Sequence, residues 1–174
     1  MPFEAGMAGN LERGMATTSS SETAPAIVFL PARQGDAEAI AEMVRAAYAR
    51  WIPVIGREPR PMTVDYHKAL NDNDFTLAYL GDNLAGLIET IAHGDHLWIE
   101  NVAVEPQYQG RGIGGALLRH AEEKALAAGL REMRLLTNES FATNVVLYEK
   151  LGYVTDRREP FMNGITLYMS KQLA

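Results

Sequence analysis

Apolar residues recur along the chain with two different periods, and these predict a mixture of strands and helices. Runs with strand character are short and are bounded by turn residues or proline, as is typical of strands. They cover residues 27–30, 75–80, 84–92, 97–104, 132–137, 153–156 and 165–170. Gly81-Asp82-Asn83 and a second turn at 93–96 make the second, third and fourth strands an antiparallel meander, and Asn163-Gly164 predicts another tight turn.

In several segments between the strands, apolar residues recur at the spacing of a helix. Behind Asp36, a good N-cap residue, apolar positions recur every three or four residues as far as Trp51. Prolines at 53, 59 and 61 then predict a loop, after which Thr63 is expected to cap a short helix ending near Leu70. Two further helices are predicted, at residues 112–128 and 141–151, and each is followed by a glycine.

The order of these elements indicates the fold class. A strand, a helix and a strand between residues 97 and 137 form a crossover, which places the two strands parallel in one sheet. We therefore expect an α/β (α+β) protein with a mixed central sheet, an antiparallel N-terminal meander, a parallel central pair and flanking helices. Residues 1–24, rich in Gly, Ser and Thr, predict a flexible tail, native or a cloning remnant, and residues 25–174 a single domain.

Composition narrows the classes of function. The chain has 174 residues and no cysteine, which excludes disulfides, thiolate nucleophiles and cysteine-ligated metal centres. A net charge of -6 without clustered Lys or Arg argues against nucleic acid and favours a cationic small molecule or basic peptide. Because no apolar run approaches the roughly 20 residues of a membrane span and no signal peptide is evident, a cytoplasmic location is expected.

The most informative segment is a glycine-rich turn between the strand at 97–104 and the following helix. A helix N-terminus carries unpaired N–H groups and partial positive charge, and glycine lets a backbone approach phosphate oxygens closely. The turn is therefore suited to a phosphate or diphosphate, although a plain strand-to-helix turn is the alternative. Neither a Rossmann glycine spacing nor a Walker Gly-Lys-Ser/Thr sequence is present.

The turn, Gln109-Gly110-Arg111-Gly112-Ile113-Gly114, resembles the signature of the GNAT superfamily of N-acetyltransferases: Gln or Arg, two residues, Gly, one residue, Gly or Ala. The strand at 99–104 resembles the family's central strand, and Asn144, Tyr148 and the sequence at 149–153 resemble its later motif. The resemblance extends in element order from Ile27 to the C-terminus. It implies an acetyl-CoA-dependent enzyme that acetylates an amine, with a central strand pair splayed for the cofactor. It also allows for a homodimer, since many relatives dimerise.

The resemblance also implies roles for individual residues. Glu100 would be the base, directly or through water, and Tyr148 the general acid. The alternatives are a solvent-facing or ion-paired glutamate and a packed aromatic that uses its hydroxyl locally. Arg57 and Tyr66 are candidates for the acceptor site, although Arg57 could equally lie in water. No metal is expected, since the His and carboxylate spacings are unconvincing. The implied cofactor contacts are main-chain groups of Val102 and Val104, the loop residues Gln109, Gly110, Arg111, Gly112, Ile113 and Gly114, and the side chains of Asn138 and Asn144.

Some of these assignments have alternatives. Arg111 is as readily a solvated arginine as a phosphate ligand, and Asn138 can cap the next helix instead of contacting cofactor. At the level of function, the alternatives to an enzyme are a non-catalytic acyl-CoA-binding sensor or regulatory module on the same fold, and a loop that binds another nucleotide.

Overall fold

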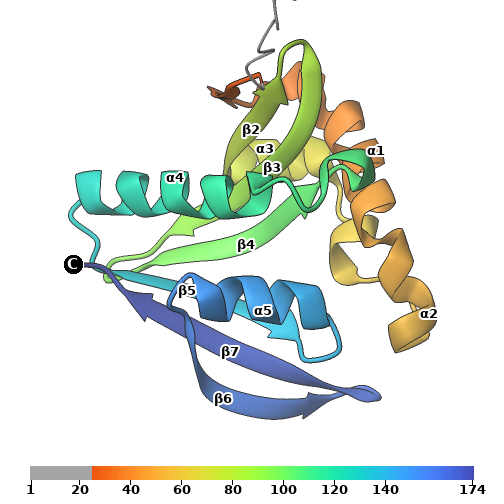
Figure 1. Cartoon of the computed structure of the whole chain (residues 1–174), viewed down its shortest axis with the longest axis vertical. Helices are drawn as coiled ribbons and strands as arrows, with labels where there is room; N and C mark the ends of the chain where they lie inside the picture. The colour runs from red at the N-terminus through yellow and green to blue at the C-terminus, as the bar shows by residue number, and fades with distance from the viewer. Residues whose placement is uncertain (1–24) are drawn as a thin grey trace, which may run out of the picture.

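Seven strands form a single sheet in the order β1-β2-β3-β4-β5-β7-β6 in the computed structural model, which describes residues 25–174 (Figure 1). The tail predicted at residues 1–24 lies outside the described residues. The strands are β1 (Ile27–Pro31), β2 (Asp74–Leu80), β3 (Asn83–Ala92), β4 (Leu97–Val104), β5 (Glu132–Asn138), β6 (Val154–Phe161) and β7 (Gly164–Gln172). The α-helices are α1 (Ala37–Tyr48), α2 (Ile52–Ile55), α3 (Tyr66–Asp72), α4 (Ile113–Ala127) and α5 (Ala142–Lys150), and the 3-10 turns are η1 (Gln34–Asp36), η2 (Ala49–Trp51), η3 (Arg60–Thr63) and η4 (Pro106–Tyr108).

The sheet is antiparallel at every pairing except that of β4 with β5. These two strands are parallel because α4 crosses from the end of one to the start of the other. The mixed sheet, its antiparallel meander and its parallel central pair are therefore as the sequence predicts.

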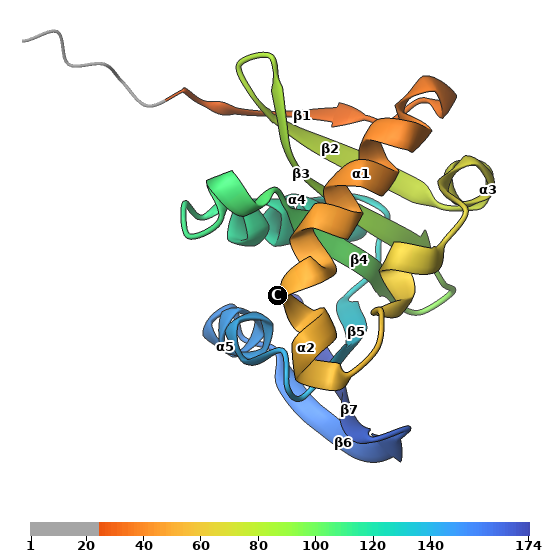
Figure 2. The same cartoon turned by 90° about the vertical axis from the view of Figure 1, so that its right-hand side faces the viewer.

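Helices cover both faces of the sheet (Figure 2). On one face α4 contributes a buried stripe that includes Ile113, Leu117 and Leu118, together with Tyr148 of α5. On the other face α1 buries residues at helical spacing, among them Ile40 and Val44, and α3 packs beside it. The apolar periodicities read from the sequence thus correspond to two separate cores, one on each side of the sheet.

Strand β4 contributes to both cores because a β-bulge reverses its alternation. Its register with β3 pairs Asn101 with Glu89 and Ile99 with Thr90, which leaves Glu100 as the extra residue. Ile99 therefore faces the α4 core, whereas Ala103 faces the α1 core. A strand without the bulge would keep both residues on one face.

Several local details differ from the sequence predictions. Helix α3 is capped by Asp65, whose carboxylate accepts hydrogen bonds from two amides of its first turn, and not by Thr63. The segment predicted as a loop contains the short helix α2, because proline is tolerated in a first helical turn. Asp36 lies at the N-cap position of α1, but its carboxylate accepts from the amide of Arg33 instead.

The C-terminal hairpin also differs from its prediction. Strand β6 extends to Phe161, beyond the predicted end at 156, and the turn is formed by Met162 and Asn163. The left-handed residue is Met162, with φ of 52°, and not Gly164. No helix within residues 25–174 is long and apolar enough to cross a membrane.

Candidate active site

The centre of the sheet contains a gap between β4 and β5. The two strands pair over only three residues, Leu97, Ile99 and the residue between them, and then diverge. The amide of Glu105 donates to Ala85 on β3, so by alternation the main-chain groups of Val102 and Val104 point away from β3 and into the gap. The gap therefore presents an unpaired strand edge in the middle of the sheet.

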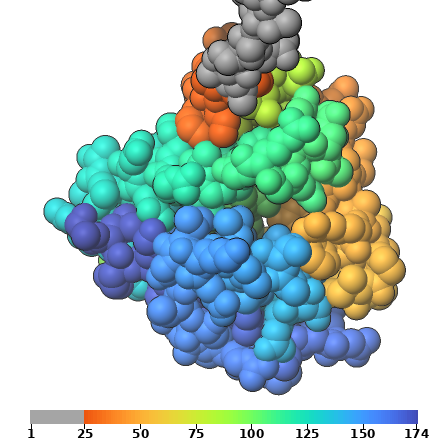
Figure 3. Space-filling model, in the orientation of Figure 1, coloured from red at the N-terminus to blue at the C-terminus, as the bar shows by residue number. Residues whose placement is uncertain are grey.

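A cavity of about 670 Å³ occupies this gap and extends beneath α1 and α3. In the space-filling view a hollow opens where the segments of α4, α5 and α1–α2 meet (Figure 3). The cavity wall includes seven of the residues proposed from the sequence. These are Arg57, Tyr66, Glu100, Val102, Asn138, Asn144 and Tyr148.

The glycine-rich loop precedes α4 beside the open edge of β4. Gly110 and Gly112 have φ of 77° and 81°, a conformation in which glycine is favoured, and a Cβ added to either would meet no atom within 4 Å. No side chain caps α4. Within residues 25–174, no backbone carbonyl or side chain accepts a hydrogen bond from the amides of residues 110–114. The loop thus offers a row of free N–H groups at the positive end of a helix of 15 residues.

Side chains hold this loop against its neighbours. Gln109 donates from Nε2 to the carbonyl of Val104 at 3.1 Å, and its Oε1 accepts from Arg50 at 3.1 Å. Arg50 also donates to Oγ1 of Thr143 on α5 at 2.7 Å, and its guanidinium lies over the ring of Trp51. Arg50 therefore connects η2, the glycine-rich loop and α5, and all its hydrogen-bond partners are uncharged.

Within the loop the other predicted residues have distinct surroundings. The Arg111 guanidinium lies 5.5 Å from the ring centroid of Tyr108 on the exposed surface. The Ile113 side chain is buried in the α4 core, so only its amide faces the loop. A Cβ on Gly114 would come within 3.2 Å of Leu147 on α5, which shows how closely the start of α4 approaches that helix.

Tyr148 and Asn144 lie one helical turn apart on α5 and both face the cavity, as their spacing predicts. Tyr148 is 8% exposed, and nothing in the part of the chain that the structure describes hydrogen-bonds its hydroxyl. Burial raises the pKa of Tyr148 to about 12. The phenol therefore stays protonated at neutral pH, with its hydroxyl open to the cavity.

A network of buried hydroxyl and amide groups lies under the bulged part of β4. Tyr48 donates to Oδ1 of Asn101 at 2.7 Å and approaches the carbonyl of Val102 at 3.2 Å. Asn101 in turn donates to the hydroxyl of Tyr66, which donates to the carbonyl of Pro61. Burial raises the pKa of both tyrosines above the usual value for a phenol. The network fixes the main chain next to Glu100 and links it to α1 and α3.

Two carboxylates reach the cavity from neighbouring strands. Glu100 accepts from the indole Nε1 of Trp98 at 2.7 Å. Glu89 of β3 is 3% exposed and accepts from Nδ2 of Asn73, at the end of α3, at 2.7 Å. Burial raises the pKa of Glu89 above its ordinary value, the Asn73 hydrogen bond opposes this shift, and the charge of Glu100 adds to it.

The remaining candidates line the cavity with other contacts. The Oδ1 of Asn138 accepts from the amide of Ser140, two residues on, in a turn that precedes α5. Arg57 lies near Phe161, with its guanidinium carbon 5.7 Å from the ring centroid, in the loop that follows α2. No group of three or more His, Asp or Glu residues between 25 and 174 is arranged to hold a metal ion.

Sequence reasoning did not identify Arg50, Tyr48, Asn101 or Glu89. Arg50 meets its partners across 59 and 93 residues of chain, a separation that no local pattern reveals. Glu89 carries a signal that could have been used, because it is the one charged residue in a mostly apolar strand.

Comparisons with known proteins identify the family to which the chain is similar. Residues 39–153 match the Acetyltransferase (GNAT) family. The chain is 37% identical over 59 residues to the [ribosomal protein bS18]-alanine N-acetyltransferase of Escherichia coli K12, a match that covers 34% of this chain and 40% of that relative. It therefore spans less than half of this curated relative.

Solved structures show the same fold. The crystal structure of the ribosomal-protein-S18-alanine N-acetyltransferase from Escherichia coli has a TM-score of 0.71 at 20% identity, covering 86% of this chain and 95% of that one. The PaiA N-acetyltransferase from Thermoplasma acidophilum, solved in complex with coenzyme A, has a TM-score of 0.73 at 22% identity, covering 84% of this chain and 99% of that one.

Proposed function

The chain belongs to the GNAT family of acetyltransferases, and from this premise we propose that it moves an acetyl group from acetyl-CoA to a primary amine of a small molecule or peptide by direct attack. The observation that carries the proposal is the row of unpaired amides at residues 110–114, next to an unpaired edge of β4. Together they form a cradle for a diphosphate and a slot for an extended amide-containing arm.

The cradle fits the diphosphate of coenzyme A. Its glycines leave the space above the amides open, and the α4 N-terminus supplies partial positive charge. Arg50 adds a full positive charge that no carboxylate neutralises within the described part of the chain, so we include it among the cofactor-binding residues. Acetyl-CoA, when bound, supplies an acetyl thioester, which is activated toward amines.

The slot is formed by main-chain groups of β4. The carbonyl of Val104 accepts from Gln109, and that of Val102 is approached by Tyr48, so the amides of these two valines are the groups left for a ligand. In this proposal the Val102 amide hydrogen-bonds the thioester carbonyl and withdraws electron density from its carbon. Gln109 then acts by holding the loop to the strand, and Asn144 faces the same slot from α5.

The proposed chemistry uses two side chains of the cavity. Glu100 accepts a proton from the acceptor ammonium, directly or through water, because only a neutral amine attacks. Tyr148 hydrogen-bonds the departing sulfur, for which a protonated phenol without another partner is well suited. Much of the acceleration comes from holding the two substrates in one cavity, and no enzyme nucleophile is needed.

Acetyl-CoA thiol release, measured against polyamines, amino acids, aminoglycosides and peptide N-termini, tests the proposal. A peptide beginning with alanine belongs in the panel, because a relative is named for alanine acetylation of a ribosomal protein. We expect turnover with at least one of these amines and much less with Tyr148→Phe. Binding of CoA without transfer to any amine would instead indicate an acyl-CoA sensor.

A further inference from the structure

The part of the cavity beneath α1 and α3 contains two carboxylates, of which Glu89 is buried and Glu100 is half-buried. Glu89 and Glu100 are hydrogen-bonded by the uncharged groups of Asn73 and Trp98, each at 2.7 Å. Neither carboxylate takes part in an ion pair within residues 25–174. Buried carboxylates are normally paired with a cation, because desolvation of an isolated charge is costly.

The two carboxylates belong to one site. Glu89 pairs across the sheet with Asn101, the residue that follows Glu100 at the bulge, and both acids line the same cavity. The charge of Glu100 contributes to the raised pKa of Glu89, as expected of like charges that are close together.

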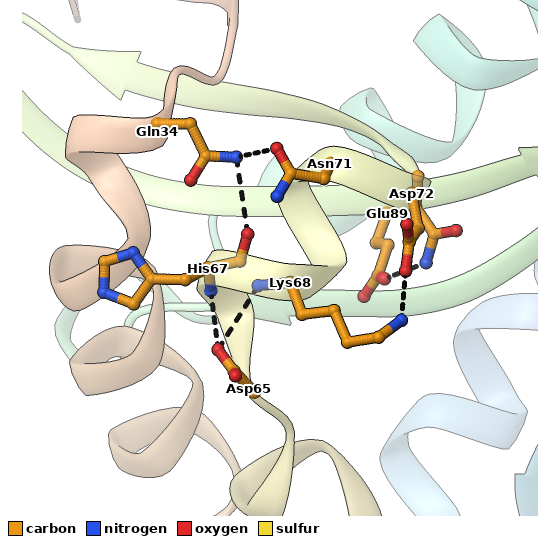
Figure 4. A network of polar contacts seen from close by, with 8 residues as sticks. Gln34, Asp65, His67, Lys68, Asn71, Asp72 and Glu89 are labelled. Atoms are coloured by element: carbon orange, nitrogen blue, oxygen red, sulfur yellow. Dashed lines mark hydrogen bonds and ion pairs between the residues drawn. The ribbon is translucent and has the colours of Figure 1, made fainter.

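The cations nearby do not neutralise these acids. Lys68 is paired with Asp72 on the same helix, and Figure 4 shows this pair beside Glu89. Arg57 lies near Phe161, and Arg60 lowers the pKa of Glu89 but forms no ion pair with it. The two arginines line the cavity from the loop after α2 and from η3, whereas the two acids lie on β3 and β4.

An independent observation marks where the reacting end of a ligand lies. Tyr148 is 8% exposed and lines the cavity, and its hydroxyl has no hydrogen-bond partner among residues 25–174. An unsatisfied polar group in such a position is one that a ligand completes. Glu100 borders the gap into which the open edge of β4 faces, whereas Glu89 lies on the next strand, farther from α5.

We propose that the acceptor is a dication: besides the amine that is acetylated, it carries a second ammonium or guanidinium group, which Glu89 binds while Glu100 faces the reacting amine. This inference rests on the proposed acetyltransferase function and narrows its substrate class. The charge balance supports it, because a second cation would supply the partner that Glu89 lacks. An acceptor with one amine would leave that carboxylate buried and unpaired.

The test compares primary amines that all have four carbons but differ at the end opposite the reacting amine. Putrescine carries a second ammonium, butylamine a methyl group and γ-aminobutyrate a carboxylate. We expect kcat/KM for putrescine to exceed that for butylamine by roughly 10- to 100-fold, the range typical of a hydrogen bond to a charged group. The proposal would be overturned if butylamine or γ-aminobutyrate were turned over as well as putrescine or better. In the case of γ-aminobutyrate, such a result would indicate that the arginines bind the carboxylate of the acceptor.

A pair of variants assigns the effect to Glu89. Glu89→Gln keeps the hydrogen bond from Asn73 but removes the charge, so the putrescine-to-butylamine ratio should fall toward one. Glu123→Gln, an exposed position on α4, is the matched control and should keep the ratio of the unmodified protein. An unchanged ratio in Glu89→Gln would contradict the assignment.

Calorimetry separates this inference from the proposed function. Putrescine is titrated into the CoA-loaded protein, where no acetyl group is present to transfer. If putrescine binds at least tenfold more tightly than butylamine, and Glu89→Gln loses this difference, the dication site is supported. This holds even if no amine is acetylated, because a lack of acetylation would overturn only the proposed function. Equal binding of the two amines overturns the inference even if another amine is a good acceptor.

Discussion

Substituting Gly112 by alanine tests the diphosphate cradle most directly. Gly112 is the N-cap of α4 with φ of 81°, and a Cβ there would meet no protein atom within 4 Å. The free protein therefore suffers backbone strain but no steric clash. A ligand phosphate on the loop amides, by contrast, would have to approach past the new methyl group.

The two effects have separable magnitudes. An alanine in the left-handed region lowers the free energy of unfolding by roughly 1–2 kcal/mol. The lower conformational entropy of the unfolded chain offsets about 0.4–1 kcal/mol of this loss. The net loss of about 1 kcal/mol corresponds to a fall in Tm of roughly 2–4 °C for a domain of this size. Loss of one charge-assisted hydrogen bond, about 1.5–3 kcal/mol, weakens CoA binding by roughly 10- to 100-fold.

Gly129 provides the matched control for this substitution. It has φ of 78° and equally open surroundings, but it follows the opposite end of α4, about 22 Å away along the helix. Gly129→Ala should lower Tm by a similar amount and leave CoA affinity unchanged. Thermal unfolding and calorimetry with CoA measure both effects. Equal CoA affinity in the two variants would refute the assignment of the loop amides to the diphosphate.

Three further outcomes are expected. Tyr148→Phe should lower kcat by about 100-fold or more with CoA affinity retained, measured by thiol release and calorimetry; unchanged kcat across the pH range would remove the phenol from the mechanism. Arg50→Ala should weaken CoA about tenfold but leave pantetheine unaffected, whereas Arg45→Ala, an exposed control on α1, should change neither. Because the folded-state pKa of Glu89 is raised, the folded protein holds this proton more tightly, and the free energy of unfolding should fall as pH rises from the ordinary glutamate pKa through the raised one. Urea unfolding of Glu89→Gln at acidic and neutral pH should lack this contribution, and parallel curves for the two proteins would contradict it.

Much of the fold could be predicted because its information is local. Strand β4 was predicted with its observed bounds, and α4 to within a residue, since alternation, helical spacing and glycine stops act over a few neighbouring residues. The local errors concerned competing hydrogen-bond acceptors and turn geometry. Asp65 lies two residues beyond Thr63 and caps α3 in its place, and Met162 takes a left-handed conformation that residue type would assign to glycine.

The residues of the candidate site likewise fall into those that the sequence could predict and those that it could not. The glycine-rich loop and the Asn144–Tyr148 pair were visible because each lies in one short segment with a fixed spacing. The bulge at Glu100 was not visible, because it depends on the register between two strands. Arg50 and Glu89 were missed for a related reason: their significance comes from partners that only the folded chain brings together.

The short β4–β5 pairing has a mechanical consequence. Strands β1 to β4 form one plate and β5 to β7 another, and within the sheet they share a seam of only three residue pairs. Because no strand pairs with β4 beyond this seam, the amides along its unpaired edge should exchange with solvent faster than those of the paired strands. A molecule that spans the opening ties the plates together, and its binding should therefore stiffen the protein far from any atom that it touches.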